Sequence, residues 1–414
     1  MAIYYPASPV RHEPFTGRPS AMNESFSDHL LVLTGTQPFF ILALVNRPIL
    51  ISDGRSLPSS HSSLRTMAKN GLEFPIEPKI GEGLRQFVYS QLFITPKPPS
   101  HSFAGQTVIV TGSNSGLGLE SARYFYKLGA AKLILGVRTP SKGEAAKEDI
   151  VKSVGGRKDG ASVIEVWNVD VGSTGSVLAF VQRMKDLPRV DVLLCNAGVN
   201  HKQYQLDEGI ERSMQINVLN TFLFALSSLP KLRETKAQFP DSSPHITIVS
   251  SDAYRLTKFV EINTPDIYEA FNDRSTFNGQ ARYQDSKLLQ VLVLREVVKR
   301  LAKHKSDIPP ITFNLVSPGL CVTNIDNKDG KYGLGMRLVH KVFYRTTEVG
   351  ARTLVHATYA GPETHGGYLV DQRLPELESW ILTDMGQRAQ LKAYEQTMAI
   401  LEKRKPGIAS EARI

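Results

Sequence analysis

The sequence has 414 residues, a formal net charge of +9, 41% hydrophobic residues and 21% charged residues. This balance is ordinary for a globular protein and excludes disorder throughout the chain. The positive charge could suggest nucleic acid, but no recognition motif accompanies it, so we expect no nucleic-acid partner.

The cysteine count and the hydropathy pattern limit the compartment. The chain has 2 cysteines, Cys195 and Cys321, each in an apolar stretch. We therefore expect no disulfide scaffold, and a reducing, cytoplasmic location fits better. No run reaches the roughly 18 to 20 apolar residues that a membrane-spanning helix needs. The nearest candidate, residues 30–51, is interrupted by prolines, glycine and polar residues, so we predict no transmembrane segment and no ordinary secretory signal.

The first part of the chain is irregular in composition. Residues 1–80 are rich in Ser, Pro, Gly and Arg and show no sustained period, apart from the apolar run 39–45. We predict an irregular N-terminal extension, and the sequence leaves open a tail, a targeting segment or a gene-model artefact. Residues 81–102 are predicted as a lead-in, with a short amphipathic helix at 83–93 and a proline-rich end.

After Phe103, apolar runs alternate with longer amphipathic stretches, a pattern typical of βαβ units and a parallel sheet. Strands are predicted at 107–110, 132–137, 163–168, 190–195, 245–250, 312–316 and 367–370. Helices are predicted at 118–128, 142–153, 176–185, 206–228, 281–302, 347–360 and 386–403. The expected fold class is α/β, a Rossmann-type doubly wound parallel sheet of about seven strands. It would form a single domain over 103–403, with 404–414 as a C-terminal tail.

The first predicted strand leads directly into a glycine-rich turn and then into a helix. Such a turn lets backbone N–H groups and the positive end of a helix approach a pyrophosphate, and glycine permits the close approach. The spacing is Gly-x-x-x-Gly-x-Gly, which differs from the Gly-x-Gly-x-x-Gly fingerprint, and a tight surface loop is the competing interpretation. We predict a dinucleotide site at Gly112, Ser113, Asn114, Ser115, Gly116, Leu117 and Gly118.

The residue at the end of the second strand bears on the choice of cofactor. It is Arg138, about 20 positions past the last glycine of the turn. An acid there would bind the ribose 2′-hydroxyl of NAD, whereas an arginine can pair with a 2′-phosphate. Lys142 adds a second cation, so we predict NADP(H), with a solvated surface arginine as the alternative. Asp170, after the third strand, could accept from the adenine amino group or simply begin a helix.

A tyrosine and a lysine share one face of a later predicted helix. The segment RYQDSKLL places Tyr283 and Lys287 at positions i and i+4, which lie on one helix face. A nearby ammonium favours the phenolate and so lowers the pKa of a tyrosine from its usual value near 10. That shift would suit general acid catalysis near neutral pH. Because Tyr-x-x-x-Lys is common by chance, the pair points to function only together with other motifs.

Those other motifs occur in a definite order along the chain. After the glycine-rich turn come Asn196-Ala197-Gly198, Asn217, Ser250-Ser251, the pair Tyr283 and Lys287, and then Pro318-Gly319 with Thr323. In this order the chain resembles the short-chain dehydrogenase/reductase family over about residues 103–402.

The resemblance implies a role for each matching residue. Tyr283 would donate the proton in carbonyl reduction, Lys287 would bind the nicotinamide ribose and tune the phenol, and Ser251 would hydrogen-bond to the substrate carbonyl. Asn217 would lie at a helix irregularity and hold a water that connects Lys287 to solvent. The cofactor would also contact Asn196, Ala197 and Gly198 at the adenosine ribose, and Pro318, Gly319 and Thr323 at the nicotinamide amide. No metal site is expected.

Each of these residues also has a purely structural explanation. Ser251 could cap a helix or turn, Asn217 could be an ordinary polar residue within a helix, and Pro318-Gly319 could form a plain turn.

About thirty residues separate Ser251 from Tyr283, more than many family members have. This insertion is similar to that of the retinol-dehydrogenase-like branch and, more closely, to that of fungal members from secondary-metabolite pathways. We expect it to form part of the rim of the substrate pocket. The segment after Thr323 would be a substrate lid, whose cations could equally contact a membrane surface: Lys331, Arg337, Lys341 and Arg345.

The predicted function is hydride transfer between NADPH and a ketone or alcohol carbon of a largely apolar small molecule in secondary metabolism. The alternatives are a retinol- or steroid-type alcohol dehydrogenase and a non-catalytic NADP-binding regulatory protein. All four catalytic positions carry the expected residue types, which favours an enzyme. The expected partner is a small carbonyl or alcohol substrate, and the chain could form a homo-oligomer.

Overall fold

A computed structural model of the chain describes residues 71–78, 80–304, 310–322 and 343–414. The chain divides into two compact units, 1–55 and 56–414, and every described residue belongs to the second. The predicted extension up to residue 70, Thr323 and the cations Lys331, Arg337 and Lys341 lie outside the described residues.

One parallel sheet of 7 strands, in the order β3-β2-β1-β4-β7-β8-β9, organises this unit. The strands are β1 Thr107–Thr111, β2 Lys132–Val137, β3 Ile164–Asn168, β4 Val192–Cys195, β7 His245–Val249, β8 Thr312–Ser317 and β9 Tyr368–Val370. Every residue of β1, β4 and β8 is buried, as parallel strands covered on both faces require. The predicted α/β class and doubly wound sheet are confirmed.

The order of the strands creates a topological switch point at the middle of the sheet. The chain adds β2 and β3 on one side of β1 and then returns to pair β4 on the other side. Connections on the two sides therefore lead away from each other at β1 and β4. In open α/β sheets, ligands bind at such a switch point, beyond the carboxyl ends of the strands.

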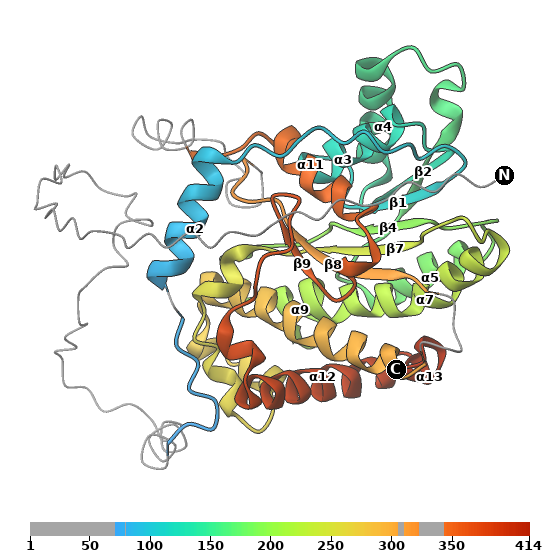
Figure 1. The fold of residues 1–414 in the computed structure, drawn as a ribbon. Helices are drawn as coiled ribbons and strands as arrows, with labels where there is room; N and C mark the ends of the chain where they lie inside the picture. Colours follow the sequence, from blue (N-terminus) through green and yellow to red (C-terminus); the bar gives the residue numbers. More distant parts are fainter. Residues whose placement is uncertain (1–70, 79, 305–309, 323–342) are drawn as a thin grey trace, which may run out of the picture. The chain divides into compact units, whose positions relative to one another are not determined.

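Helices cover both faces of the sheet, as Figure 1 shows. One face carries α3 Gly116–Lys127, α4 Pro140–Val154 and α11 Thr347–Ala357, and the other carries α5 Thr174–Met184, α7 Thr221–Gln238 and α9 Gly279–Leu301. Two hydrophobic cores result, because Val108 and Val110 of β1 contribute to one and Ile109 to the other. Alternate residues of a strand point to opposite faces of the sheet.

The remaining elements lie outside these layers or in the loops. Helix α2 Ile80–Phe93 precedes the sheet, whereas α12 Asp384–Arg404 packs on α9 and α13 Ile408–Ala412 packs on α7. Short helical turns occupy Gly160–Val163, Asp252–Leu256, Val260–Asn263, Arg274–Thr276, Ala302–His304, Pro362–Thr364 and Ser379–Leu382, with α8 at Ile267–Phe271. Among the described residues, no helix has the length and apolar character needed to cross a membrane.

The helix predicted over 206–228 is wrong at its beginning. Residues there form a small hairpin, β5 Leu206–Asp207 and β6 Ile210–Glu211, followed by α6 Arg212–Met214. The chain reverses at Glu208 and Gly209, whose φ angles are 51° and 79° and do not fit a right-handed helix. The Glu211 carboxylate then accepts from the backbone N–H groups of Ser213 and Met214, which starts the helix there.

The end of the chain differs from the predicted tail over 404–414. In α13, the side chains of Ile408 and Ala412 are fully buried. Arg233 of α7 donates from Nη2 to the carbonyl oxygen of Ala412 at 2.8 Å. The segment is short and carries little periodicity, so its burial depends on the surface that α7 and α12 offer it.

Residues ahead of α2 also pack on the domain. Phe74 and Ile76 are 2% and 4% exposed. The backbone N–H of Phe74 donates to Oδ1 of Asn263 at 2.8 Å, and Nδ2 of Asn263 donates to the Phe74 carbonyl oxygen at 3.2 Å. The folded unit therefore begins before the predicted domain boundary at 103.

We predict that a chain starting at Met67 unfolds at the same temperature and urea concentration as the full chain, because it keeps Phe74, Ile76 and α2. A chain starting at Ser102 should be less stable by several kcal/mol, since each buried Phe or Ile contributes about 1.5–3 kcal/mol. Should the shorter chain not fold, Phe74→Ala in the full chain measures the same packing and should cost about 3–5 kcal/mol. Equal stability of Phe74→Ala and wild type would contradict this assignment.

Candidate active site

The turn between β1 and α3 is too narrow for side chains at its glycines. A Cβ atom on Gly118 would lie 2.4 Å from the carbonyl oxygen of Gly112 and 2.5 Å from Nδ2 of Asn196. Gly112 and Gly116 have φ angles of 66° and 59°, which glycine adopts without strain. Ser115 precedes α3, and its side chain makes no capping hydrogen bond. No side-chain cap from Ser115 therefore competes with an anion at the start of α3.

The loop after β4 holds this turn in place through hydrogen bonds. Asn196 donates from Nδ2 to the carbonyl oxygens of Thr111 and Gly112 at 2.9 and 3.3 Å. In return, Oγ1 of Thr111 accepts from the backbone N–H groups of Asn196 and Ala197, both at 3.0 Å. The predicted cofactor segments Gly112–Gly118 and Asn196–Gly198 are therefore brought together at the switch point.

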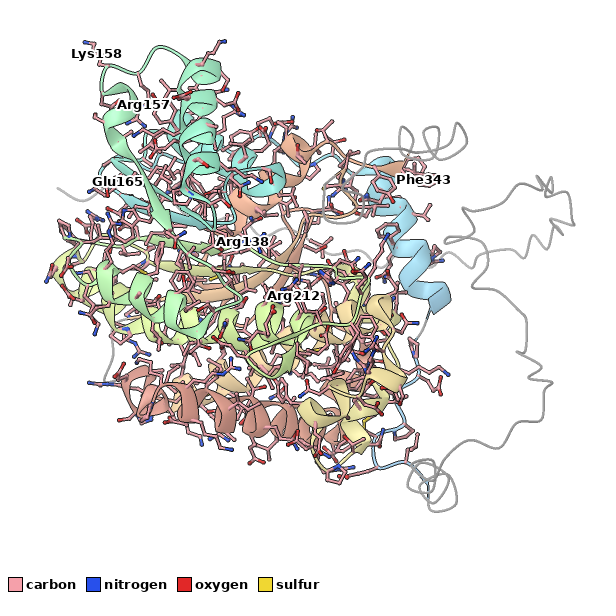
Figure 2. All side chains as sticks on the ribbon, turned by 180° about the vertical axis from the view of Figure 1, so that it is seen from behind. Arg138, Arg157, Lys158, Glu165, Arg212 and Phe343 are labelled. Carbon is pink, nitrogen blue, oxygen red and sulfur yellow. The ribbon has the colours of Figure 1, made fainter. Side chains whose placement is uncertain are left out.

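The predicted adenosine-side residues follow the neighbouring strands. Arg138, labelled in Figure 2, comes directly after β2, and its carbonyl oxygen accepts from Nδ2 of Asn168 at 2.8 Å. Lys142 lies in the first turn of α4, and both cationic residues are exposed. Asp170 follows β3, and its Oδ1 accepts from the N–H of Gly172 at 2.9 Å. Because β1, β2 and β3 are parallel, these residues share one edge of the sheet with the glycine-rich turn.

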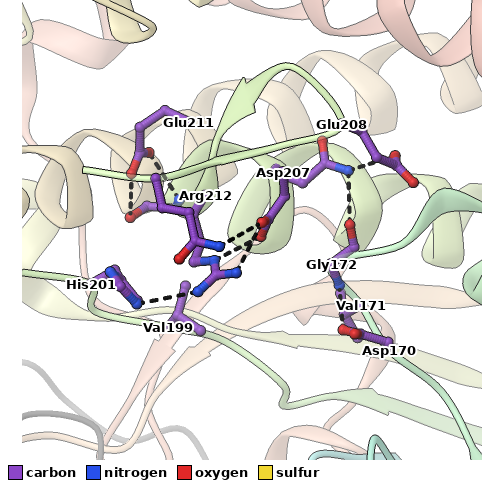
Figure 3. A network of polar contacts seen from close by, with 12 residues as sticks. Asp170, Val171, Gly172, Val199, His201, Asp207, Glu208, Glu211 and Arg212 are labelled. Carbon is purple, nitrogen blue, oxygen red and sulfur yellow. Dashed lines mark hydrogen bonds and ion pairs between the residues drawn. The ribbon is translucent and has the colours of Figure 1, made fainter. Parts of the chain in front are cut away.

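A polar network joins the Asp170 turn to the unpredicted hairpin (Figure 3). Gln215 donates from Nε2 to the Gly172 carbonyl oxygen at 3.2 Å and to Glu208 at 2.8 Å. Arg212 binds the Asp207 carboxylate through two nitrogens, at 2.7 and 2.9 Å. The helix predicted over 206–228 gave no indication of this network. Asp207-Glu208-Gly209, a polar run ending in glycine, is the hairpin signal that could have found it.

Tyr283 and Lys287 lie one turn apart in α9, at the carboxyl end of β7. Lys287 Nζ is 5.5 Å from the centre of the Tyr283 ring and donates to the Val249 carbonyl oxygen at 3.0 Å. The lysine side chain is buried, and this burial lowers the pKa of Lys287 to about 7. Loss of water around an ammonium favours its neutral form. Lys287 is therefore a cation that can give up its proton near neutral pH.

Ser251 follows β7, where its hydroxyl group caps a helical turn and can still donate a hydrogen bond. Its Oγ accepts from the backbone N–H of Ala253 at 3.2 Å, so it caps the helical turn Asp252–Leu256. A hydroxyl that accepts one hydrogen bond keeps its own hydrogen to donate. The next residue, Asp252, accepts from Oγ of Ser317 at 2.8 Å, and burial raises the pKa of its carboxyl group. The cap thus leaves the Ser251 proton for another acceptor.

Asn217 lies in a π-helical stretch, Gln215–Asn220, between α6 and α7. Its side chain donates from Nδ2 to the Val199 carbonyl oxygen at 2.9 Å and to Oγ of Ser286 at 3.0 Å. Ser286 in turn donates to the Tyr283 carbonyl oxygen at 2.7 Å. A π-helical turn is rare and frequently marks a functional site. Asn217 therefore connects the loop after β4 to the turn of α9 that carries Tyr283 and Lys287.

Buried charges anchor the insertion to the same turn of α9. Arg282, 1% exposed, forms an ion pair with Glu261 of the insertion. Thr257 donates to the carboxylate of Asp285, and burial raises the pKa of Asp285 well above its usual value. These residues carry no sequence signal of their own, since a charged residue beside Tyr283 usually indicates an exposed helix face. They hold the residues on both sides of Tyr283 in place.

The last predicted segment follows β8. Pro318 and Gly319 form a turn in which Gly319 has a φ angle of 75°, and Thr323 lies outside the described residues. The carboxyl ends of β1, β4, β7 and β8 thus gather the described candidate residues along one edge of the sheet. Those of β2 and β3 carry the predicted adenosine-side residues.

Comparison with known proteins identifies this arrangement. The sequence model for short chain dehydrogenase matches residues 106–256. Over 329 residues, 78% of this chain and 99% of the relative, the chain is 38% identical to the short chain dehydrogenase/reductase dmxR8 of Cryptosporiopsis sp.. It is 41% identical over 299 residues to the short chain dehydrogenase atnD of Emericella nidulans, covering 70% of this chain and 92% of the relative.

The fold agrees with these sequence comparisons. A crystal structure of an uncharacterized protein from Mycobacterium paratuberculosis matches with a TM-score of 0.52 and 25% identity, over 73% of this chain and 98% of that protein. The match to dmxR8 spans 99% of the length of that relative, which is enough to assign the family. The chain belongs to the short-chain dehydrogenase family.

Proposed function

We propose that the protein is an NADP-dependent oxidoreductase that transfers a hydride between NADPH and a ketone or alcohol carbon of a largely apolar small molecule. The observation that carries the proposal is the position of Ser251, Tyr283 and Lys287 at the end of β7, close to the glycine-rich turn after β1. In the sheet, only β4 separates these two strands. A substrate bound between the residues at the end of β7 and the glycine-rich turn would contact both the proton donors and the nicotinamide of a bound dinucleotide.

The glycine-rich turn fits the pyrophosphate of a dinucleotide. Gly118 has no room for a Cβ atom, the start of α3 has no side-chain cap from Ser115, and the buried Oγ of Ser113 has no hydrogen-bond partner in the described structure. We assign the pyrophosphate to residues 112–118 on this basis.

The rest of the cofactor would contact residues along the same edge. Arg138 and Lys142 would hold the 2′-phosphate, and Asp170 the adenine amino group. Asn196, Ala197 and Gly198 would contact the adenosine ribose, while Pro318, Gly319 and Thr323 would cover the nicotinamide.

When bound, the cofactor would supply the hydride, and the chain's own residues would handle the proton. As the carbonyl carbon gains the hydride, its oxygen becomes basic, and the Tyr283 hydroxyl would pass its proton to that oxygen. Ser251 would donate a hydrogen bond to the same oxygen and so polarise the carbonyl. The Lys287 ammonium would stabilise the resulting phenolate and return a proton to it, with Asn217 holding a water as the path to solvent.

The biological setting is proposed from the relatives. The dmxR8 and atnD proteins come from fungi and share 38% and 41% identity with this chain. The long insertion before Tyr283 is the feature that we connected with fungal enzymes of secondary metabolism. We therefore propose a ketone or alcohol intermediate of a secondary-metabolite pathway as the substrate.

The cofactor proposal predicts at least a tenfold preference for NADPH over NADH in fluorescence titrations, equal to about 1.4 kcal/mol. Arg138→Asp should weaken NADPH binding selectively, because a carboxylate repels the 2′-phosphate. Lys158→Asp makes the same kind of charge change before β3, at the opposite edge of the sheet (Figure 2), and should leave the preference intact. Equal affinities for NADPH and NADH in wild type would contradict the proposal.

Tyr283→Phe keeps the ring and removes only the transferable proton. We expect kcat on apolar ketones to fall by about 10² or more, with NADPH affinity nearly unchanged. Lys287→Ala should impair both quantities, because the ammonium would contact the ribose as well as the phenol. Tyr89→Phe, an exposed tyrosine on α2, serves as the control. Turnover of Tyr283→Phe close to wild type would show that another group donates the proton.

The lowered pKa of Lys287 predicts a pH-dependent stability of the cofactor-free protein. Above about pH 7 the folded lysine is neutral, whereas the unfolded lysine keeps its proton up to its ordinary value of 10.5. Unfolding therefore takes up a proton, so the free energy of unfolding should rise with pH by about 1.4 kcal/mol per unit, relative to Lys287→Met. Urea unfolding of both proteins at pH 7, 8 and 9 measures this difference. Parallel pH profiles would mean that Lys287 stays charged in the fold.

A further inference from the structure

Helix α2 contacts the turn that follows β8, although more than two hundred residues separate them (Figure 1). We propose that Gln91 of α2 is a positioning residue for the nicotinamide half of the site, acting through the turn Pro318–Cys321. This inference rests on the proposed function, because the turn would cover a nicotinamide only in a dinucleotide enzyme. From its sequence alone, α2 was expected only as part of a lead-in to the domain.

Both polar groups of the Gln91 side chain hydrogen-bond to the backbone. Nε2 donates to the carbonyl oxygens of Leu320 and Phe343, both at 3.1 Å, and Oε1 accepts from the N–H of Leu320 at 3.3 Å. Gln91 is 9% exposed, so water cannot readily replace these bonds. The Gln91 amide therefore pairs with both backbone polar groups of Leu320, as a residue of a neighbouring strand would. It also binds the backbone at Phe343, ahead of α11.

Gly319 packs directly against this contact. Its φ angle of 75° favours glycine, and a Cβ atom there would lie 2.5 Å from Oε1 of Gln91 and 2.8 Å from Nη1 of Arg345. The turn therefore has no room to move toward α2, and Gln91 and Arg345 form the surface on which it rests.

A buried ion pair fixes the end of α2 beneath the turn. Arg345 and Asp371 have side chains that are both 5% exposed, with Nη1 and Oδ1 2.6 Å apart. Arg345 Nη2 donates to the carbonyl oxygens of Ser90 and Ile94, both at 2.9 Å, and Oγ of Ser90 donates to Asp371 at 2.5 Å. A cation at the carboxyl end of a helix is favourable. Arg345, which was expected on a lid or against a membrane surface, is thus buried inside the domain.

These contacts reach only one half of the proposed cofactor site. The turn after β8 is separated from β1 by β4 and β7, whereas Arg138 and Asp170 follow β2 and β3 on the other side of β1. Loss of the Gln91 hydrogen bonds should therefore weaken binding of the nicotinamide half of the cofactor and leave binding of the adenosine half unchanged. A helix that merely stabilised the fold would affect both halves alike.

The test compares Gln91→Leu with Gln86→Leu in the full chain. Leucine removes the three hydrogen bonds of Gln91 with little change in size, and Gln86 is an exposed glutamine on the same helix. Isothermal titration should show NADPH binding weakened about tenfold by Gln91→Leu and by less than twofold by Gln86→Leu. Binding of 2′,5′-ADP, which contains only the adenosine half, should stay within about twofold in both variants.

A milder variant covers the case in which Gln91→Leu does not fold. Ser90→Ala removes the hydrogen bonds of the Ser90 hydroxyl to Asp371 and Arg345 and leaves Gln91 in place, so it should weaken NADPH binding about threefold and again spare 2′,5′-ADP. Equal weakening of NADPH and 2′,5′-ADP, or unchanged NADPH affinity in a folded variant, would overturn the role of α2. A wild-type protein that binds 2′,5′-ADP but neither binds NADPH more tightly nor reduces any ketone would instead overturn the proposed function.

Discussion

The close approach of Gly118 to the carbonyl oxygen of Gly112 and the amide of Asn196 brings the start of α3 against the ends of β1 and β4. No side chain fits between them, so the helix begins at the switch point between β1 and β4. The loop after β4 is held there by Thr111, and the same loop reaches Asn217 through Val199. A series of hydrogen bonds through this loop therefore connects the glycine-rich turn to the residue that holds the Tyr283 turn of α9.

The turn of α9 that carries Tyr283 is held from two directions. On one side, Asn217 binds Ser286, and Ser286 binds the Tyr283 carbonyl oxygen. On the other, Arg282 pairs with Glu261 of the insertion. Because buried charges are costly when they lose a partner, the insertion and α9 are expected to keep one arrangement. Between these anchors, Lys287 remains buried enough for its pKa to fall to about 7, a value suited to proton exchange at neutral pH.

The described lead-in is part of the domain and not a mere connection to it. Phe74 hydrogen-bonds to Asn263 of the insertion, and Gln91 hydrogen-bonds to Leu320 in the turn after β8. The Arg345–Asp371 pair joins α2 to the loops after β9 and before α11. Segments that are distant in the sequence thus meet around the side of the site opposite the adenosine residues. This gives the proposed nicotinamide side a support that the seven-stranded sheet alone does not supply.

The sequence by itself determined the features whose causes are local. Apolar runs marked the seven strands, the glycine-rich turn marked the switch point, and the i, i+4 spacing placed Tyr283 and Lys287 on one helix face. Only the tertiary structure decided the burial of α13 and of Arg345, and the contact of Gln91 with Leu320. An arginine or a glutamine has the same local pattern whether it is exposed or buried. Its partners come from distant parts of the chain, so only the packing of the finished fold can bury it and satisfy its hydrogen bonds.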